Sequence, residues 1–118
     1  MIRKESEIKE TPNPNMRGGK GTGRMKVFFS PSEFSTPLSA FNLLTLEPGV
    51  SVGPHRHEGS EEIYFVLEGR GLAKDDGQDV ELKPGDALLT CDGHSHSLEN
   101  PGPGPLKILT VLSHKVKP

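Results

Sequence analysis

The segment GVSVGPHRHEGSEEIYFVLEG, residues 49–69, carries the clearest structural pattern of the chain. Side chains alternate across a strand, so His55 and His57 point to one face while Arg56 between them points away. Glu62 follows after a short polar connection, where an adjacent antiparallel strand places a carboxylate opposite the two imidazoles. The segment therefore predicts two neighbouring strands that bring two histidines and one glutamate together.

The rest of the chain is also organised as short strands separated by glycine and proline. The 118 residues include 14 glycines and 11 prolines, no tryptophan, and 31% hydrophobic residues, which favours frequent turns over long helices. Further strands are expected at residues 27–29, 41–46, 71–74, 79–82, 87–90, 94–98 and 106–112, with a hairpin turn at Asp76-Gly77. About nine strands without a helix predict an antiparallel sandwich or barrel, and a jelly roll buries such strands while it limits exposed edges.

Charge and cysteine content restrict the expected partners and location. The formal net charge is −2, from 14 basic and 16 acidic residues that are mixed along the chain. No broad positive face is expected, so the sequence predicts no nucleic-acid partner. It shows neither a secretory leader nor a long apolar stretch, which predicts no membrane partner. Cys91 is the single cysteine, no internal disulfide is expected, and the predicted location is cytoplasmic.

Two motifs of this chain resemble those of the cupin superfamily. The first motif combines Gly, His-x-His, Glu and Gly at fixed spacing, and it reads here as Gly49, His55, His57, Glu62 and Gly69. The second reads as Gly85, Gly93, His96 and Asn100, and it departs from the family only at Cys91, where proline is usual. The resemblance covers roughly residues 40–112. It implies a small single-domain cupin, whose fold is an all-β jelly-roll β-barrel, also called a double-stranded β-helix.

The resemblance also implies one divalent metal ion per chain, held by His55, His57, Glu62 and His96. Neutral imidazoles and one carboxylate suit manganese, iron, zinc, nickel or copper, and manganese is the first expectation. Four protein ligands leave two positions of a six-coordinate metal open to a small oxygenated ligand, which is a carboxylate such as oxalate, or a sugar. An enzyme of this kind is a metal-dependent decarboxylase, dioxygenase or sugar isomerase. The alternative is a non-catalytic, metal-dependent binding or sensing module.

Two residues near the expected ligands are candidates for a catalytic role. Tyr64 shares the inward parity of Glu62, so its hydroxyl is able to hydrogen-bond a ligand, and the alternative is an aromatic residue that only lines the barrel. His94 stands two residues before His96. It is either a proton donor beside the metal or an exposed residue of the approaching loop.

The N-terminal region lacks apolar periodicity. Residues 1–24 are predicted to be an arm that is flexible or packs on the barrel or on a partner subunit, and residues 25–118 form the barrel domain. Within the arm, the glycine-rich segment 17–24 carries the cations Arg17, Lys20 and Arg24. Either one of them folds over the barrel mouth to pair with an anionic ligand, with Arg24 as a candidate site residue, or the segment is a flexible linker.

One strand of the expected barrel is apolar on both faces. Ile63, Phe65 and Leu67 alternate with Tyr64 and Val66, so one set lines the barrel and the other meets a second sheet or a second subunit. The sequence therefore predicts a homodimer.

Overall fold

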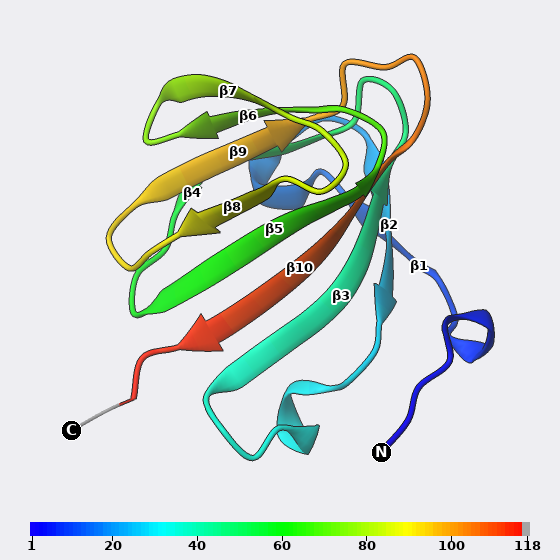
Figure 1. Ribbon diagram of the computed structural model, residues 1–118, viewed down its shortest axis with the longest axis vertical. Coiled ribbons are helices and arrows are strands. Elements are labelled where there is room, and N and C mark those ends of the chain that lie inside the picture. The colour runs from blue at the N-terminus through cyan, green and yellow to red at the C-terminus, as the bar shows by residue number, and fades with distance from the viewer. Residues whose placement is uncertain (117–118) are drawn as a thin grey trace.

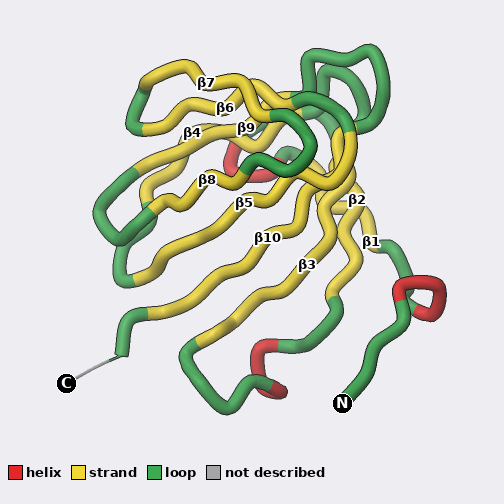
Figure 2. Tube along the Cα trace, viewed as in Figure 1, coloured by secondary structure: helices red, strands yellow, loops and turns green. Residues whose placement is uncertain are grey.

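The computed structural model describes residues 1–116, which form ten β-strands and three short 3-10 turns (Figure 1). The strands are β1 (Thr11–Pro14), β2 (Thr22–Val27), β3 (Leu38–Leu46), β4 (Ser51–Arg56), β5 (Ser60–Glu68), β6 (Gly71–Asp75), β7 (Gln78–Leu82), β8 (Ala87–Thr90), β9 (Ser95–Glu99) and β10 (Leu106–His114). The turns are η1 (Glu5–Glu7), η2 (Met16–Gly18) and η3 (Pro31–Glu33). Figure 2 shows how strands dominate the trace, and the predicted all-β class is confirmed.

The strands form two antiparallel sheets. The larger sheet has the order β1-β2-β3-β10-β5-β8, and the smaller has the order β4-β9-β6-β7. β10, the last strand described, lies between β3 and β5. A strand near the C-terminus thus pairs with two strands from the first two thirds of the chain in the larger sheet (Figure 1). This arrangement is the predicted jelly roll. None of the helices described in residues 1–116 is long and apolar enough to cross a membrane.

The core lies between the sheets and follows from the alternation of side chains along each strand. On β5, Tyr64 and Val66 face inward and are 3% and 0% exposed. The inner faces of the other strands contribute further buried residues, among them Leu44, Leu46, Val52, Leu98, Leu106 and Ile108. The hairpin between β6 and β7 turns at Asp76 and Gly77, both of which have the positive φ that a tight turn of this kind requires.

Residues 11–24, which the sequence assigns to an arm, contribute to the larger sheet. β1 pairs with β2, and β2 pairs with β3, so the predicted boundary at residue 24 falls inside a strand. Pro12 and Pro14 fit β1 because an edge strand has one side that needs no N–H donors. Met16, in the turn between β1 and β2, is 9% exposed and packs into the core. The segment therefore forms one wall of the interior.

Candidate metal centre

Four side chains converge between the two sheets, and they are the four that the motifs predict. His55, His57, Glu62 and His96 each present one ligand atom, and these atoms lie within 4.8 Å of one another. The Nε2 atom of His96 is 2.9 Å from that of His55 and 3.0 Å from that of His57. A carboxylate oxygen of Glu62 lies 3.1 Å from His96 Nε2 and 3.2 Å from His57 Nε2.

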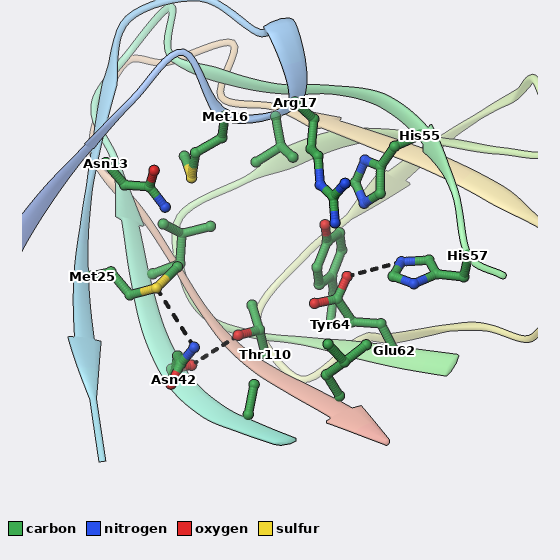
Figure 3. Close-up of a pocket in the computed structure, with 14 residues that line it drawn as sticks. Asn13, Met16, Arg17, Met25, Asn42, His55, His57, Glu62, Tyr64 and Thr110 are labelled. Atoms are coloured by element: carbon green, nitrogen blue, oxygen red, sulfur yellow. Dashed lines mark hydrogen bonds and ion pairs between the residues drawn. The ribbon is translucent and has the colours of Figure 1, made fainter. Parts of the chain in front are cut away.

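The register of the strands explains this convergence. β4 pairs with β9 so that His55 stands directly opposite His96. His57 follows the end of β4, and its backbone is tied to the β8–β9 loop by hydrogen bonds with His94 and Gly93. The sequence predicts Glu62 on a strand adjacent to that of the two histidines, which is wrong, because β5 belongs to the facing sheet. Glu62 instead reaches the histidines across the interior (Figure 3). Two sheets thus supply the two sides of the cluster.

Each histidine is oriented through its second ring nitrogen. His55 Nδ1 lies 2.8 Å from the carbonyl oxygen of Gly53. A carbonyl only accepts, so Nδ1 of His55 carries the proton and Nε2 presents a lone pair to the cluster. The Nδ1 atoms of His57 and His96 lie 3.1 Å and 2.8 Å from the hydroxyls of Ser60 and Thr90. Partners of this kind orient the rings of metal-binding histidines.

Burial favours the neutral form of His55 and His57, which is the form that binds metal. Desolvation lowers the pKa of His55, and the nearby His96 and Arg17 charges lower it further, against the opposing effect of the Gly53 carbonyl. Desolvation also lowers the pKa of His57, although the charge of Glu62 works in the opposite direction. Both rings therefore stay neutral to a lower pH than a free imidazole.

Tyr64 lies in direct contact with the cluster. Its ring stacks on that of His96, with centroids 4.5 Å apart and planes at 12°, and its hydroxyl is 3.2 Å from His96 Nε2. Burial, followed by the charge of Glu62, raises the pKa of this hydroxyl well above its ordinary value. Tyr64 is thus a permanent O–H group at the edge of the cluster.

A cavity of about 280 Å³ opens beside these residues. Its lining includes His55, His57, Glu62 and Tyr64 at one end and Asn13, Met25, Asn42 and Thr110 at the other (Figure 3). Arg17 also lines the cavity, and its guanidinium points toward Tyr64 and Glu62. The site thus combines a histidine cluster, one cation and a polar far wall.

The other candidates from the sequence lie elsewhere. Arg24 pairs with Glu10 and Glu47 at 2.9 and 3.1 Å. It does not reach the cavity, because its neighbour Met25 occupies the inward position of β2. His94 is exposed, and its Nδ1 lies 2.5 Å from Asp76, outside the four-residue cluster. Of the three cations in segment 17–24, the structure brings Arg17 to the cavity.

Sequence reasoning missed the polar residues of the far wall. Asn42 stands between Phe41 and Leu43, and Thr110 stands between Leu109 and Val111. Each interrupts a run of apolar residues at an inward position. A polar residue with inward parity in an apolar strand is the signal that would have identified both.

Fold and site together define a jelly-roll protein with a histidine-rich centre, and comparisons with known proteins agree. The cupin domain family matches residues 42–112. The chain therefore belongs to the cupin family.

Similar proteins come from Thermotoga maritima and Halomonas. An oxalate-binding protein of T. maritima is 43% identical over 112 residues, which is 95% of this chain and 93% of the relative. The crystal structure of a predicted oxalate decarboxylase from T. maritima superposes with a TM-score of 0.93 and 42% identity, over 97% of this chain and 99% of that one. KdgF from Halomonas shares the fold, with a TM-score of 0.80 at 17% identity over 99% of this chain and 96% of that one.

Proposed function

We propose that this cupin binds one divalent metal ion on His55, His57, Glu62 and His96 and thereby holds a small oxygenated ligand, a carboxylate such as oxalate, or a sugar. The observation that carries the proposal is the convergence of four ligand atoms within 4.8 Å. The Nε2 atom of His96 lies 2.9 Å and 3.0 Å from those of His55 and His57, and nitrogens this close repel one another through their lone pairs unless a proton or a cation lies among them. His57 and His96 are buried and His55 and Glu62 half-buried, and each histidine ring is oriented by a hydrogen bond at its Nδ1 atom, as is usual in metal sites.

The donor set fits the metals that nitrogen and carboxylate ligands prefer. It contains no thiolate, so manganese, iron, zinc, nickel and copper all suit it, and manganese remains our first expectation. When bound, such an ion supplies Lewis acidity, which polarises a coordinated carboxylate or carbonyl. The residues around it bring their own contributions, because Tyr64 offers an O–H donor and Arg17 a fixed positive charge.

Arg17 favours an acid as the ligand. Among residues 1–116 the guanidinium has no carboxylate within ion-pairing distance, although it lies in the cavity. An arginine without a partner beside a polar cavity is suited to a carboxylate, which its planar group binds through two hydrogen bonds. The name of the oxalate-binding relative, which spans almost the whole of this chain, supports the same ligand class.

The first experiment measures metal and ligand together. We expect about one metal ion per chain by elemental mass spectrometry of protein purified without chelator, and oxalate binding by calorimetry that disappears on metal removal. His96→Ala should lose the metal, whereas His94→Ala, which changes an exposed residue of the same loop, should retain it. A chain that takes up no metal after reconstitution, or equal losses in both variants, would contradict the proposal.

Catalysis and simple binding are separated by turnover. The names of the similar proteins include both an oxalate-binding protein and a predicted oxalate decarboxylase. Incubation of the metal-loaded protein with oxalate, followed by measurement of formate and carbon dioxide, distinguishes a decarboxylase from a non-catalytic binding or sensing module. Dioxygenase and sugar isomerase activities are tested with the same preparation, in the presence of oxygen and of phosphosugars.

The proposal includes a homodimer formed through the outer face of the larger sheet. Ile63, Phe65 and Leu67 on β5 and Leu89 on β8 point away from the core and are 37–51% exposed. Adjacent apolar side chains on neighbouring strands form a patch of the kind that covers subunit interfaces. The cytoplasmic location and the absence of nucleic-acid and membrane partners stay predictions.

A further inference from the structure

A row of polar side chains crosses the inner face of the larger sheet. Thr110 on β10 stands opposite Asn42 on β3 and opposite Tyr64 on β5. The neighbouring row, from Ile108 to Leu44 and Val66, is apolar and buried. The polar row thus begins at the tyrosine beside the histidine cluster and ends at the far wall of the cavity (Figure 3).

The side chain of Asn42 is weakly bonded within the fold, although its backbone carbonyl accepts a hydrogen bond from the Thr110 hydroxyl at 3.4 Å (Figure 3). Its Nδ2 makes one contact, at 3.6 Å, with the sulfur of Met25, which is a weak acceptor. Its Oδ1 is buried without a partner among the described residues. Asn100 shows the contrast, because its amide donates to Leu46 and Gly104 and accepts from the N–H of Gly102. Asn42 lines the cavity, and an amide with an unpaired oxygen and a weakly bonded nitrogen gains from a small rotation that brings it to a ligand.

The chemistry of the far wall differs from that of the metal end. Asn13, Asn42 and Thr110 supply its polar groups, and Met16, Met25, Ala40 and Leu44 surround them. No charged residue lines this end, so a second carboxylate finds no counter-charge there. The hydroxyl groups of a ligand are suited to this end, because a hydroxyl both donates and accepts. Such a group forms a hydrogen bond with an asparagine amide whichever way the amide is turned, and also with a threonine hydroxyl.

The distance across the row sets a minimum length for the ligand. Tyr64 and Asn42 lie two strand spacings apart, about 10 Å between their backbones. The cavity of about 280 Å³ has room for roughly nine waters at about 30 Å³ each. Oxalate, whose carboxylates are bonded directly to each other, does not span from the histidine cluster to Asn42.

We propose that the far wall, formed by Asn13, Asn42 and Thr110, binds the hydroxylated tail of an acid whose carboxylate is held at the metal end. The ligand class is then a polyhydroxylated monocarboxylate of the sugar-acid type. This inference rests on the proposed function, since it assumes that the carboxylate is bound with the metal and Arg17.

The test compares two acids that present the same head group. Gluconate and 2-hydroxyhexanoate share an α-hydroxycarboxylate and a chain length, and they differ in the hydroxyls of the tail. Calorimetry on the manganese-loaded full chain should show gluconate binding about tenfold more tightly. Asn42→Leu should remove this preference by lowering the affinity for gluconate about tenfold, which is the effect of losing one hydrogen-bonding group. The variant should leave oxalate affinity and metal content unchanged. Thr110→Val is the second variant, with the same expectation, should Asn42→Leu fail to fold.

The outcomes separate this inference from the proposed function. Equal affinities for gluconate and 2-hydroxyhexanoate, with oxalate still binding in a metal-dependent manner, would overturn the inference alone. An Asn42→Leu variant that weakens oxalate as much as gluconate would also overturn it, because the residue would then be structural. If no acid binds the metal-loaded protein more tightly than the metal-free protein, the proposed function fails as well.

Discussion

Replacing Gly53 by alanine should move the loop that carries Arg17. The β1–β2 turn packs backbone to backbone against β4, and a Cβ on Gly53 would lie 2.2 Å from the carbonyl oxygen of Arg17. This is about 1.2 Å short of the 3.4 Å at which ordinary contact begins. The loop must therefore shift by about that distance, since the atom in the way belongs to the backbone. Overpacking of this kind costs about 1–3 kcal/mol, which lowers Tm by roughly 4–12 °C in a domain of this size.

The same change should weaken ligand binding, because Gly53 connects two parts of the site. Its carbonyl orients His55, and its Cα holds the Arg17 backbone close to the strand that carries this histidine. We expect a fall in both the thermal midpoint and the affinity for oxalate, measured by calorimetry on metal-loaded protein. Gly104→Ala is the matched control, because nothing lies within 4 Å of the added Cβ. A Gly53→Ala variant with wild-type Tm and wild-type affinity would refute this reasoning.

Three further predictions concern protonation, the tyrosine and assembly. Because burial lowers the pKa of His55 and His57, the unfolded chain binds more protons than the folded chain just below the free imidazole value of about 6.5. The metal-free protein should thus lose stability as pH falls from about 6.5, and a flat urea midpoint down to about pH 5 would contradict this. Tyr64→Phe should keep the metal and the stacking of the ring on His96, but lower oxalate affinity by up to about tenfold. Unchanged affinity would show that the hydroxyl does not contact the ligand. If the proposed dimer forms through the outer face of the larger sheet, Leu89→Lys should give a monomer in analytical ultracentrifugation, whereas Leu72→Lys, on the outer face of the other sheet, should leave the dimer intact; a wild-type monomer would contradict the proposed dimer.

The histidine cluster was predictable because strand parity and turn spacing are local properties. His55 and His57 share a face by alternation alone. The expected strand beside them was wrong in its pairing, because β5, which carries Glu62, belongs to the other sheet, and the carboxylate meets the histidines across the interior. The third histidine was found from its motif rather than from geometry, since His96 is distant in sequence and only the pairing of β4 with β9 places it opposite His55. Local pattern and family resemblance thus identified the cluster jointly.

The N-terminal segment was harder to interpret for a physical reason. Its composition of proline, glycine and charged residues is typical of disordered chain, yet Pro12 and Pro14 are compatible with an edge strand, which β1 is. Composition also gave no basis for choosing Arg17 over Arg24. The choice depends on the register of β2 against β3, which turns Met25 inward and leaves Arg24 to pair with surface carboxylates.

The polar residues of the far wall connect stability with recognition. A chain selected for stability alone would have an apolar residue in place of Asn42, because its buried Oδ1 has no partner among the described residues and an unpaired buried polar group costs about 1–3 kcal/mol. Asn42→Leu should therefore raise the urea midpoint of the ligand-free protein while it abolishes the preference for a hydroxylated tail, whereas Thr110→Val also loses the hydrogen bond to the Asn42 carbonyl and should not raise the midpoint. Asn100→Leu should do the reverse, since that amide makes three hydrogen bonds within the fold. Polar residues that lower stability without forming strong hydrogen bonds within the fold are expected at ligand-binding sites. A loss of stability in Asn42→Leu would instead show that Asn42, like Asn100, has a structural role.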